Sequence, residues 1–136
     1  MDKYLNYLAL ARKGGLAERG EEPVGAAARA GKACVILVAS DAGDHTWRRA
    51  KSYVAGTDQQ CLKVPATKDE LGMAIGRTSL AVAALTDPML ALACVKAMEK
   101  PDRQILEVLE QKAQRKKDRQ KEAKAHQKNL RKGKKK

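Results

Sequence analysis

Residues 33–39, Ala-Cys-Val-Ile-Leu-Val-Ala, form a continuous apolar run that ends abruptly at Ser40 and Asp41. A short run without polar alternation is typical of a strand whose two faces are both buried. Such a strand lies inside a sheet that helices cover on each side. The stretch therefore predicts an α/β fold with this strand near its centre.

The segments around this strand alternate between helical and extended patterns. Residues 61–64 and 79–85 are further apolar runs and predict two more strands, whereas residues 16–19 are expected to form only a short extended link. Thr67 and Glu70 have the spacing of a capping box at a helix start. Glycines or capping residues bound the predicted helices, which cover residues 2–13, 20–31, 40–56, 67–76 and 86–98. This close alternation predicts a three-layer α/β/α sandwich with a small central mixed sheet.

The positive charge is concentrated near the C-terminal end of the sequence. The net charge is +12, of which residues 1–100 contribute +3 and residues 101–136 contribute +9. We therefore divide the chain into an α/β/α domain over residues 1–100 and a basic C-terminal extension over residues 101–136. Beyond a short apolar segment at 105–109, the extension has little to bury, so in isolation we expect a fluctuating helix or coil. Such a basic block usually binds a polyanion, most often nucleic acid, although it can also serve only solubility.

Composition limits the class of protein further. Cys34, Cys61 and Cys94 lie in apolar segments, and the N-terminal sequence lacks the order of a secretory signal, so we expect free thiols and a cytoplasmic location. The longest apolar stretch is interrupted at residues 86–88, which argues against a membrane span. One Trp, three Tyr and no Phe disfavour RNA binding by base stacking on exposed rings.

Four sequence strings follow one another along the chain. They are LALARKGGL (8–16), GEEPVGAAARAGKACVILVASDA (20–42), ELGMAIGR (70–77) and VAALTDP (82–88). In order and spacing, the region from Leu8 to about Met98 resembles the YlxQ-like bacterial branch of the kink-turn-binding ribosomal protein family, the L-seven-Ae and L-thirty-e superfamily. The resemblance implies an RNA-binding ribonucleoprotein component and not an enzyme.

The resemblance also assigns roles to two loops. In relatives, a glycine and the following helix N-terminus enter the RNA beside tandem sheared G·A pairs, and the loop after the last strand covers a bulged base. Carried over, the first element is at residues 20–22 and the second at residues 85–87. A helix N-terminus offers free N–H groups to phosphates, and glycine lets the backbone approach closely. With flanking cations and the basic tail, the RNA-binding candidates are Lys13, Arg19, Gly20, Glu21, Glu22, Arg29, Lys32, Leu85, Thr86, Asp87, Arg115, Lys116, Lys117 and Arg119.

The helix after Gly20 departs from the family pattern. Relatives commonly have a polar residue two positions after the glycine, then Glu or Gln, then Lys three further on. Here those positions hold Glu22, Pro23 and Ala26. Pro23 offers no side-chain hydrogen bond and Ala26 offers no charge to a phosphate, so we expect weak binding to a standard kink-turn. The flanking cations and the tail would then supply phosphate contacts.

Other clusters are better explained by structure than by chemistry. Asp41, Asp44 and His45 could be metal ligands, but carboxylates at a helix start favour a capping role. The cysteine spacing matches no Cys-x-x-Cys pattern, so we interpret the thiols as buried apolar groups. The sequence has no glycine-rich phosphate loop and no nucleophile–base arrangement, so we expect no enzyme activity, cofactor or metal.

The sequence therefore predicts a cytoplasmic, monomeric, non-catalytic RNA-binding protein of translation or ribosome assembly. Its expected partners are structured RNA, such as a kink-turn or ribosomal RNA, and ribosome or assembly proteins. The alternative is a protein–protein adaptor of the translation machinery whose basic tail binds RNA nonspecifically.

Overall fold

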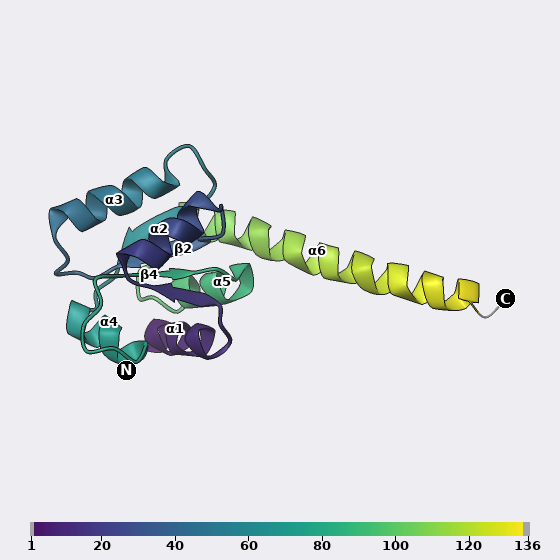
Figure 1. Ribbon diagram of the computed structural model, residues 1–136, viewed down its shortest axis with the longest axis horizontal. Coiled ribbons are helices and arrows are strands. Elements are labelled where there is room, and N and C mark those ends of the chain that lie inside the picture. The colour runs from purple at the N-terminus through teal and green to yellow at the C-terminus, as the bar shows by residue number, and fades with distance from the viewer. Residues whose placement is uncertain (1, 135–136) are drawn as a thin grey trace.

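The computed structural model describes residues 2–134, and it confirms the predicted three-layer α/β/α sandwich. Its elements are α1 (Lys3–Lys13), β1 (Ala17–Arg19), α2 (Glu21–Arg29), β2 (Val35–Val38), α3 (Asp44–Val54), β3 (Gln60–Lys63), α4 (Lys68–Ala74), β4 (Val82–Leu85), α5 (Pro88–Lys96) and α6 (Arg103–Lys134). Helices α2 and α3 cover one face of the sheet, and α1, α4 and α5 cover the other (Figure 1). Helix α6 starts against α5 and then projects from the domain (Figure 1).

The four strands form one mixed sheet in the order β1-β4-β2-β3. β4 pairs antiparallel with β1 and with β2, and β2 pairs parallel with β3. The apolar run at residues 33–39 supplies β2, whose residues are all buried, like those of β4. These two strands fill the middle of the sheet, because helices cover both of their faces and neighbouring strands satisfy both of their edges.

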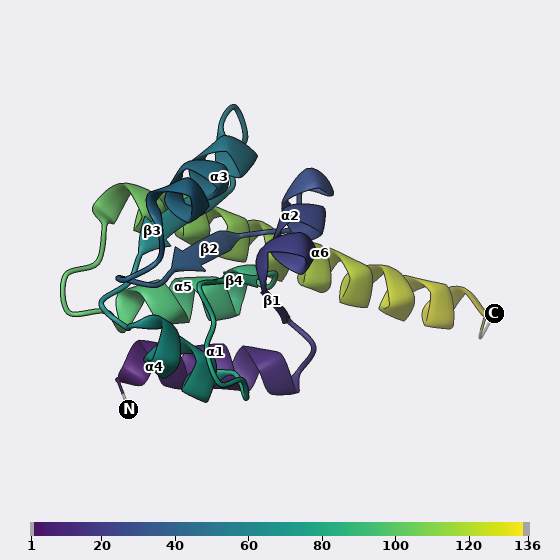
Figure 2. The same cartoon turned by 60° about the vertical axis from the view of Figure 1, so that its left-hand side comes forward.

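Alternate residues of the central strands face two separate apolar cores. Leu37 and Leu85 pack on the side of α1, α4 and α5. Ile36 and Ala84 pack on the opposite side, against α2 and α3. Ile36 and Ala84 are directly opposite each other in the β2–β4 register, and Leu85 lies two residues from the partner of Leu37. Because side chains alternate along a strand, each strand supplies residues to both cores. Figure 2 shows the two helical layers on either side of the sheet.

Two predicted element boundaries are wrong. Residues 17–19 form the edge strand β1 instead of an unpaired link, because Ala17 is in register with Leu85 of β4. Helix α3 begins at Asp44 and not at residue 40. The carboxylate of Asp41 accepts a hydrogen bond from the Lys68 backbone N–H at 2.8 Å, so it holds the start of α4 instead. The capping box of Thr67 with Glu70 is confirmed in both directions.

The three free cysteines contribute to packing. Cys34 and Cys94 are buried, and Cys61 is half-buried. Burial raises the pKa of Cys94 to about 12, and its thiol donates a hydrogen bond to the Tyr4 carbonyl oxygen. Burial also raises the pKa of Cys34 and of Cys61. Near neutral pH the thiols therefore stay protonated, and the reactive thiolate form is scarce.

The first turns of α6 continue the apolar core. Ile105, Leu109 and Ala113 are buried, and Leu109 is fully enclosed. The predicted division at residue 100 stays a prediction, but packing in the described residues runs across it. From Lys117 to Lys128 every side chain is exposed. Within residues 2–134, no helix is both long enough and apolar enough to cross a membrane.

We predict that Leu109→Ala lowers the free energy of unfolding by about 2–5 kcal/mol, because it empties a fully enclosed site between α6 and the domain. The same substitution at Leu10, which is 54% exposed on α1, should cost less than about 0.5 kcal/mol. Urea unfolding monitored by circular dichroism measures both. Equal, small losses would mean that α6 is not part of the core.

Candidate nucleic-acid interface

The two loops expected to form one RNA-binding surface lie at opposite ends of β4. At one end the Gly20 N–H donates a hydrogen bond to the Val82 carbonyl oxygen at 3.1 Å. At the other end the Thr86 N–H donates to the Leu16 carbonyl oxygen at 2.9 Å. A strand of this length separates its ends by about 10–13 Å. The candidate residues therefore divide between two surfaces.

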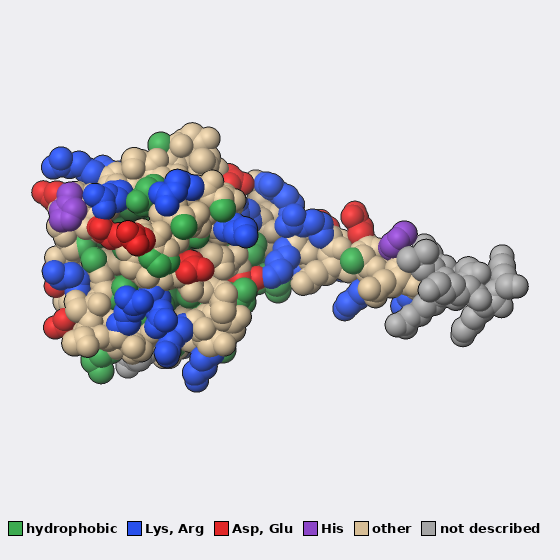
Figure 3. Space-filling model, viewed as in Figure 1, with side chains coloured by type: hydrophobic (Ala, Val, Ile, Leu, Met, Phe, Trp, Pro, Cys, Tyr) green, Lys and Arg blue, Asp and Glu red, His purple; other side chains and the backbone are tan. Residues whose placement is uncertain are grey.

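Three arginines from different elements gather at the Gly20 end of β4. The Arg19 guanidinium donates a hydrogen bond to the Ile75 carbonyl oxygen at 3.2 Å. A Cβ placed on Gly76 would lie 2.7 Å from the Arg12 guanidinium, and one placed on Gly20 would lie 3.9 Å from that of Arg77. We call this surface, made of Arg12, Arg19, Gly20, Gly76 and Arg77, the arginine face. In Figure 3 a cluster of Lys and Arg side chains is visible on the domain between α2 and α1.

Glycine is required at two positions of the arginine face. Gly20 has φ +93° and Gly76 has φ +78°, and residues with a Cβ rarely adopt such positive φ angles. Gly20 is also the N-cap of α2 and brings no side-chain cap. The first backbone N–H groups of α2 are therefore left open beside the arginines, at the positive end of the helix dipole. This combination suits an anionic ligand.

The two carboxylates at the start of α2 differ in their surroundings. Glu21 accepts hydrogen bonds from the Thr46 hydroxyl at 3.2 Å and from the Arg49 guanidinium at 2.9 Å. Its charge is thus compensated by α3. Glu22 is exposed and lies on the same outer face of α2 as Pro23, Ala26 and Arg29. Glu22 is therefore the main side chain that would repel a phosphate at this helix start.

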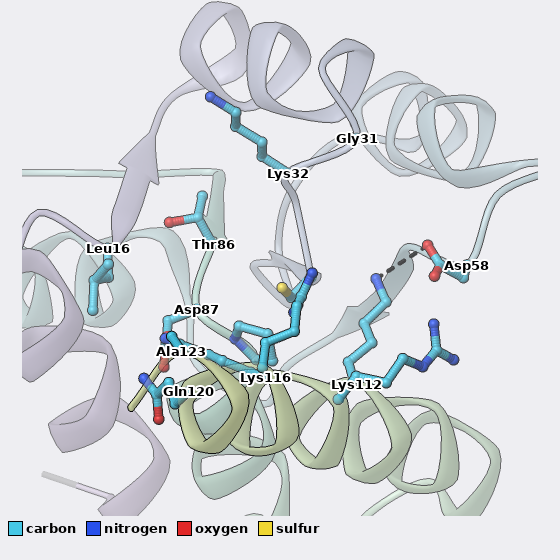
Figure 4. A pocket seen from close by; sticks show the side chains of 14 residues that line it. Leu16, Gly31, Lys32, Asp58, Thr86, Asp87, Lys112, Lys116, Gln120 and Ala123 are labelled. Carbon is cyan, nitrogen blue, oxygen red and sulfur yellow. Dashed lines mark hydrogen bonds and ion pairs between the residues drawn. The ribbon is translucent and has the colours of Figure 1, made fainter. Parts of the chain in front are cut away.

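The second surface is a groove of about 740 Å³ beside α6. It lies between this helix, the turn of residues 31–32 after α2, and the loop of residues 86–88 between β4 and α5 (Figure 4). We call it the α6 groove. Its cations are Lys32, Lys112, Arg115, Lys116 and Arg119, and its carboxylates are Asp58 and Asp87.

Two ion pairs fasten α6 along this groove. Lys116 pairs with Asp87, whose second carboxylate oxygen accepts a hydrogen bond from the Leu90 N–H at 2.9 Å and so caps α5. One turn earlier, Lys112 pairs with Asp58 at 3.2 Å (Figure 4). The side chains of Asp87 and Lys112 are 6% and 12% exposed, so both pairs are partly shielded from water. Partial shielding from water strengthens the Coulomb attraction within each pair, although Asp58 itself is 61% exposed.

The structure distributes the predicted RNA-binding residues as follows. Arg19 and Gly20 lie in the arginine face, and Lys32, Thr86, Asp87, Arg115, Lys116 and Arg119 line the α6 groove. Glu21 is half-buried at the start of α2 and paired with Arg49, and Lys13, Glu22, Arg29 and Lys117 are exposed outside both surfaces. Leu85 needs correction, because it is fully buried within β4 and has no surface to offer. Asp87 also acts inside the protein, as a cap and ion-pair partner. Whether the remaining residues contact RNA stays a prediction.

Sequence reasoning missed four charged residues of these surfaces: Arg12, Arg77, Lys112 and Asp58. Arg12 and Arg77 are distant in sequence and come together through tertiary packing, in which α1 contacts α4. The one signal available was that both arginines lie in strings that carry the family resemblance. Among the described residues, no group of three or more His, Cys, Asp or Glu side chains is arranged to hold a metal ion.

No protein-family model matches the sequence, and none of the curated proteins does. Solved structures share the fold. A protein of unknown function from Bacillus halodurans C has a TM-score of 0.68 and 25% sequence identity, and the match covers 74% of this chain and 100% of that chain. The 15.5kD RNA binding protein of Giardia lamblia has a TM-score of 0.54 and 18% identity, over 68% of this chain and 79% of that chain. At this identity the second likeness shows the fold alone.

We predict that Lys116→Ala lowers the free energy of unfolding by about 1–3 kcal/mol, because the nearly buried Asp87 carboxylate loses its cation. Lys117→Ala removes the same charge from an exposed neighbour and should change stability by less than about 0.5 kcal/mol. Thermal unfolding of both variants checks this. A Lys116 variant as stable as the Lys117 variant would show that the ion pair does not hold α6.

Proposed function

We propose that this protein is a non-catalytic RNA-binding protein whose arginine face docks on folded RNA. The observation that carries the proposal is that Arg12, Arg19 and Arg77 gather around residues 75–77, with Arg77 beside Gly20 at the uncapped N-terminus of α2. Guanidinium groups and free helix N–H groups both donate hydrogen bonds to phosphate oxygens. The absence of a side chain at Gly20 lets a ligand reach the backbone.

Three further observations support RNA as the anion. The net charge of +12 favours association with a polyanion over a small anionic metabolite. A solved structure with this fold is described as an RNA binding protein. The outer face of α2, with Pro23, Ala26 and Arg29, is exposed beside the arginine face and free to lie in a groove of folded RNA. In this proposal the RNA is structured, of the kink-turn type, and belongs to the ribosome or its assembly.

The proposal contains no chemical step. Cys34 is the thiol that lines the α6 groove. It is only 6% exposed, and burial raises its pKa, so its thiolate is scarce near neutral pH. In the proposed function the described side chains therefore act by binding alone.

We predict that Arg77→Glu weakens binding to a kink-turn hairpin about tenfold or more, because it replaces a phosphate-directed cation by an anion. Arg48→Glu is the matched control: Arg48 is exposed on α3 and lies outside both surfaces, and the charge change is the same. Filter binding of the full-length variants measures both. If the two variants lose affinity equally, only overall charge matters, and the protein–protein adaptor becomes the better interpretation.

Kink-turn recognition should improve when the missing contacts are restored. Pro23 and Ala26 are both exposed on α2, so Pro23→Glu with Ala26→Lys places new polar groups outward without disturbing the core. We expect an affinity gain of about tenfold, the worth of one charge-assisted contact. The gain should vanish on a hairpin whose tandem G·A pairs are replaced by Watson–Crick pairs. An equal gain on both hairpins would show that α2 does not read the kink-turn.

A further inference from the structure

The α6 groove carries more positive charge than the fold needs. Its two carboxylates, Asp58 and Asp87, are already paired with Lys112 and Lys116. Lys32, Arg115 and Arg119 face the groove without a carboxylate partner among residues 2–128. All three are exposed. Positive charges gathered in a concave surface repel one another and raise the local concentration of anions, so the groove favours an anionic ligand.

Four of the five groove cations come from one face of α6. Lys112, Arg115, Lys116 and Arg119 recur at the spacing of three and four residues that puts side chains on one side of a helix. Lys117 and Lys121 point to the other side and do not line the groove. The helix therefore presents two basic faces of different surroundings, one beside the domain and one toward solvent.

The position of the groove connects it to the arginine face. Helix α2 starts at the arginine face with Gly20 as its cap and ends one turn before Lys32, which stands on the far side of the groove from α6 (Figure 4). Nine residues of helix span about 13 Å. A chain a few nucleotides long could pass along α2 and touch both surfaces.

The lining indicates which anion fits. Among the described residues the lining holds no Trp, Tyr or His, so it offers no ring for base stacking. Arg115 and Arg119 are four residues apart, which puts their Cβ atoms about 5–6 Å from each other and suits successive charges along a chain. The groove is also open along α6, whose exposed cations continue beyond it. These features suit an extended polyanion better than a single small anion.

We propose that the α6 groove binds the phosphodiester backbone of single-stranded RNA that flanks the folded RNA on the arginine face. Lys32 contacts the strand from the turn after α2, and Arg115 and Arg119 contact it from α6. The backbone is held without reading base identity, because the groove supplies cations and no stacking surface. This inference rests on the proposed function, since the same RNA occupies both surfaces.

The experiment compares the two faces of α6 in the full-length protein. Arg115→Glu with Arg119→Glu alters the groove face, and Lys117→Glu with Lys121→Glu alters the outer face while changing the net charge by the same amount. The probe is a fluorescein-labelled oligouridine of about 12 nucleotides, within the usual length range of single-strand sites, and fluorescence anisotropy is measured over a salt series. We expect the groove variant to lose at least tenfold more affinity than the outer variant. Its slope of log K against log salt should flatten by about 1.4, or 0.7 for each of two lost phosphate contacts.

Two additional measurements make the outcome unambiguous. Arg115→Lys with Arg119→Lys keeps the charge and should retain most of the affinity, and circular dichroism checks that every variant keeps its helix content. Equal losses in the groove and outer variants would overturn the proposal, because α6 would then bind RNA by its overall positive charge and not by its groove face. Polyaspartate that competes as well as oligouridine at equal charge would also overturn it, in favour of an acidic protein segment.

Failure of the groove can be separated from failure of the proposed function. If the groove proposal alone fails, Arg77→Glu still weakens hairpin binding, but the groove variant binds oligouridine as the outer variant does. If the proposed function fails, Arg77→Glu and Arg48→Glu bind the hairpin equally. Oligouridine binding by the groove then reports only a polyanion site.

Discussion

The backbone pairing of β4 with β1 on one side and with β2 on the other holds this molecule together. The pairing of β4 with β2 forms the centre of the sheet, on which both helical layers pack. Its pairing with β1 brings the end of α1 and the start of α2 to the same sheet edge. The two candidate surfaces lie at the two ends of this one strand. A change that unpairs β4 would therefore affect the packing, the arginine face and the α6 groove together.

Much of the fold follows from local patterns in the sequence. The apolar run at residues 33–39 predicts the buried strand β2, and the Thr67 capping box predicts the start of α4. Strand β1 was missed because Ala17, Glu18 and Arg19 have no strand pattern of their own; they are extended only because β4 offers them partners. The start of α3 was misplaced for a similar reason. Asp41 is a residue type that commonly caps helices, but its carboxylate accepts a hydrogen bond from the distant Lys68 backbone N–H.

The candidate site was less accessible to sequence reasoning. Gly20 and the start of α2 could be identified, because a glycine before a helix start has a local signature. Arg77 beside Gly20 and Arg12 beside Gly76 could not, since both come from other parts of the chain. Asp87 illustrates the converse. A carboxylate in a loop suggests a ligand contact, yet here it is buried, caps α5 and pairs with Lys116, so its role is to position α6 beside the domain.

The length of α6 separates two tasks that binding proteins often combine. The helix has 32 residues and so extends over about 48 Å, although only its first turns pack on the domain (Figure 1). At physiological salt an exposed charge acts over about 8 Å. Under the proposed function, the outer cations of α6 attract RNA independently of the domain, at a distance where the shape of the docking surfaces has no influence. The proposal then assigns the encounter rate to the projecting helix and the residence time to the surfaces at the two ends of β4.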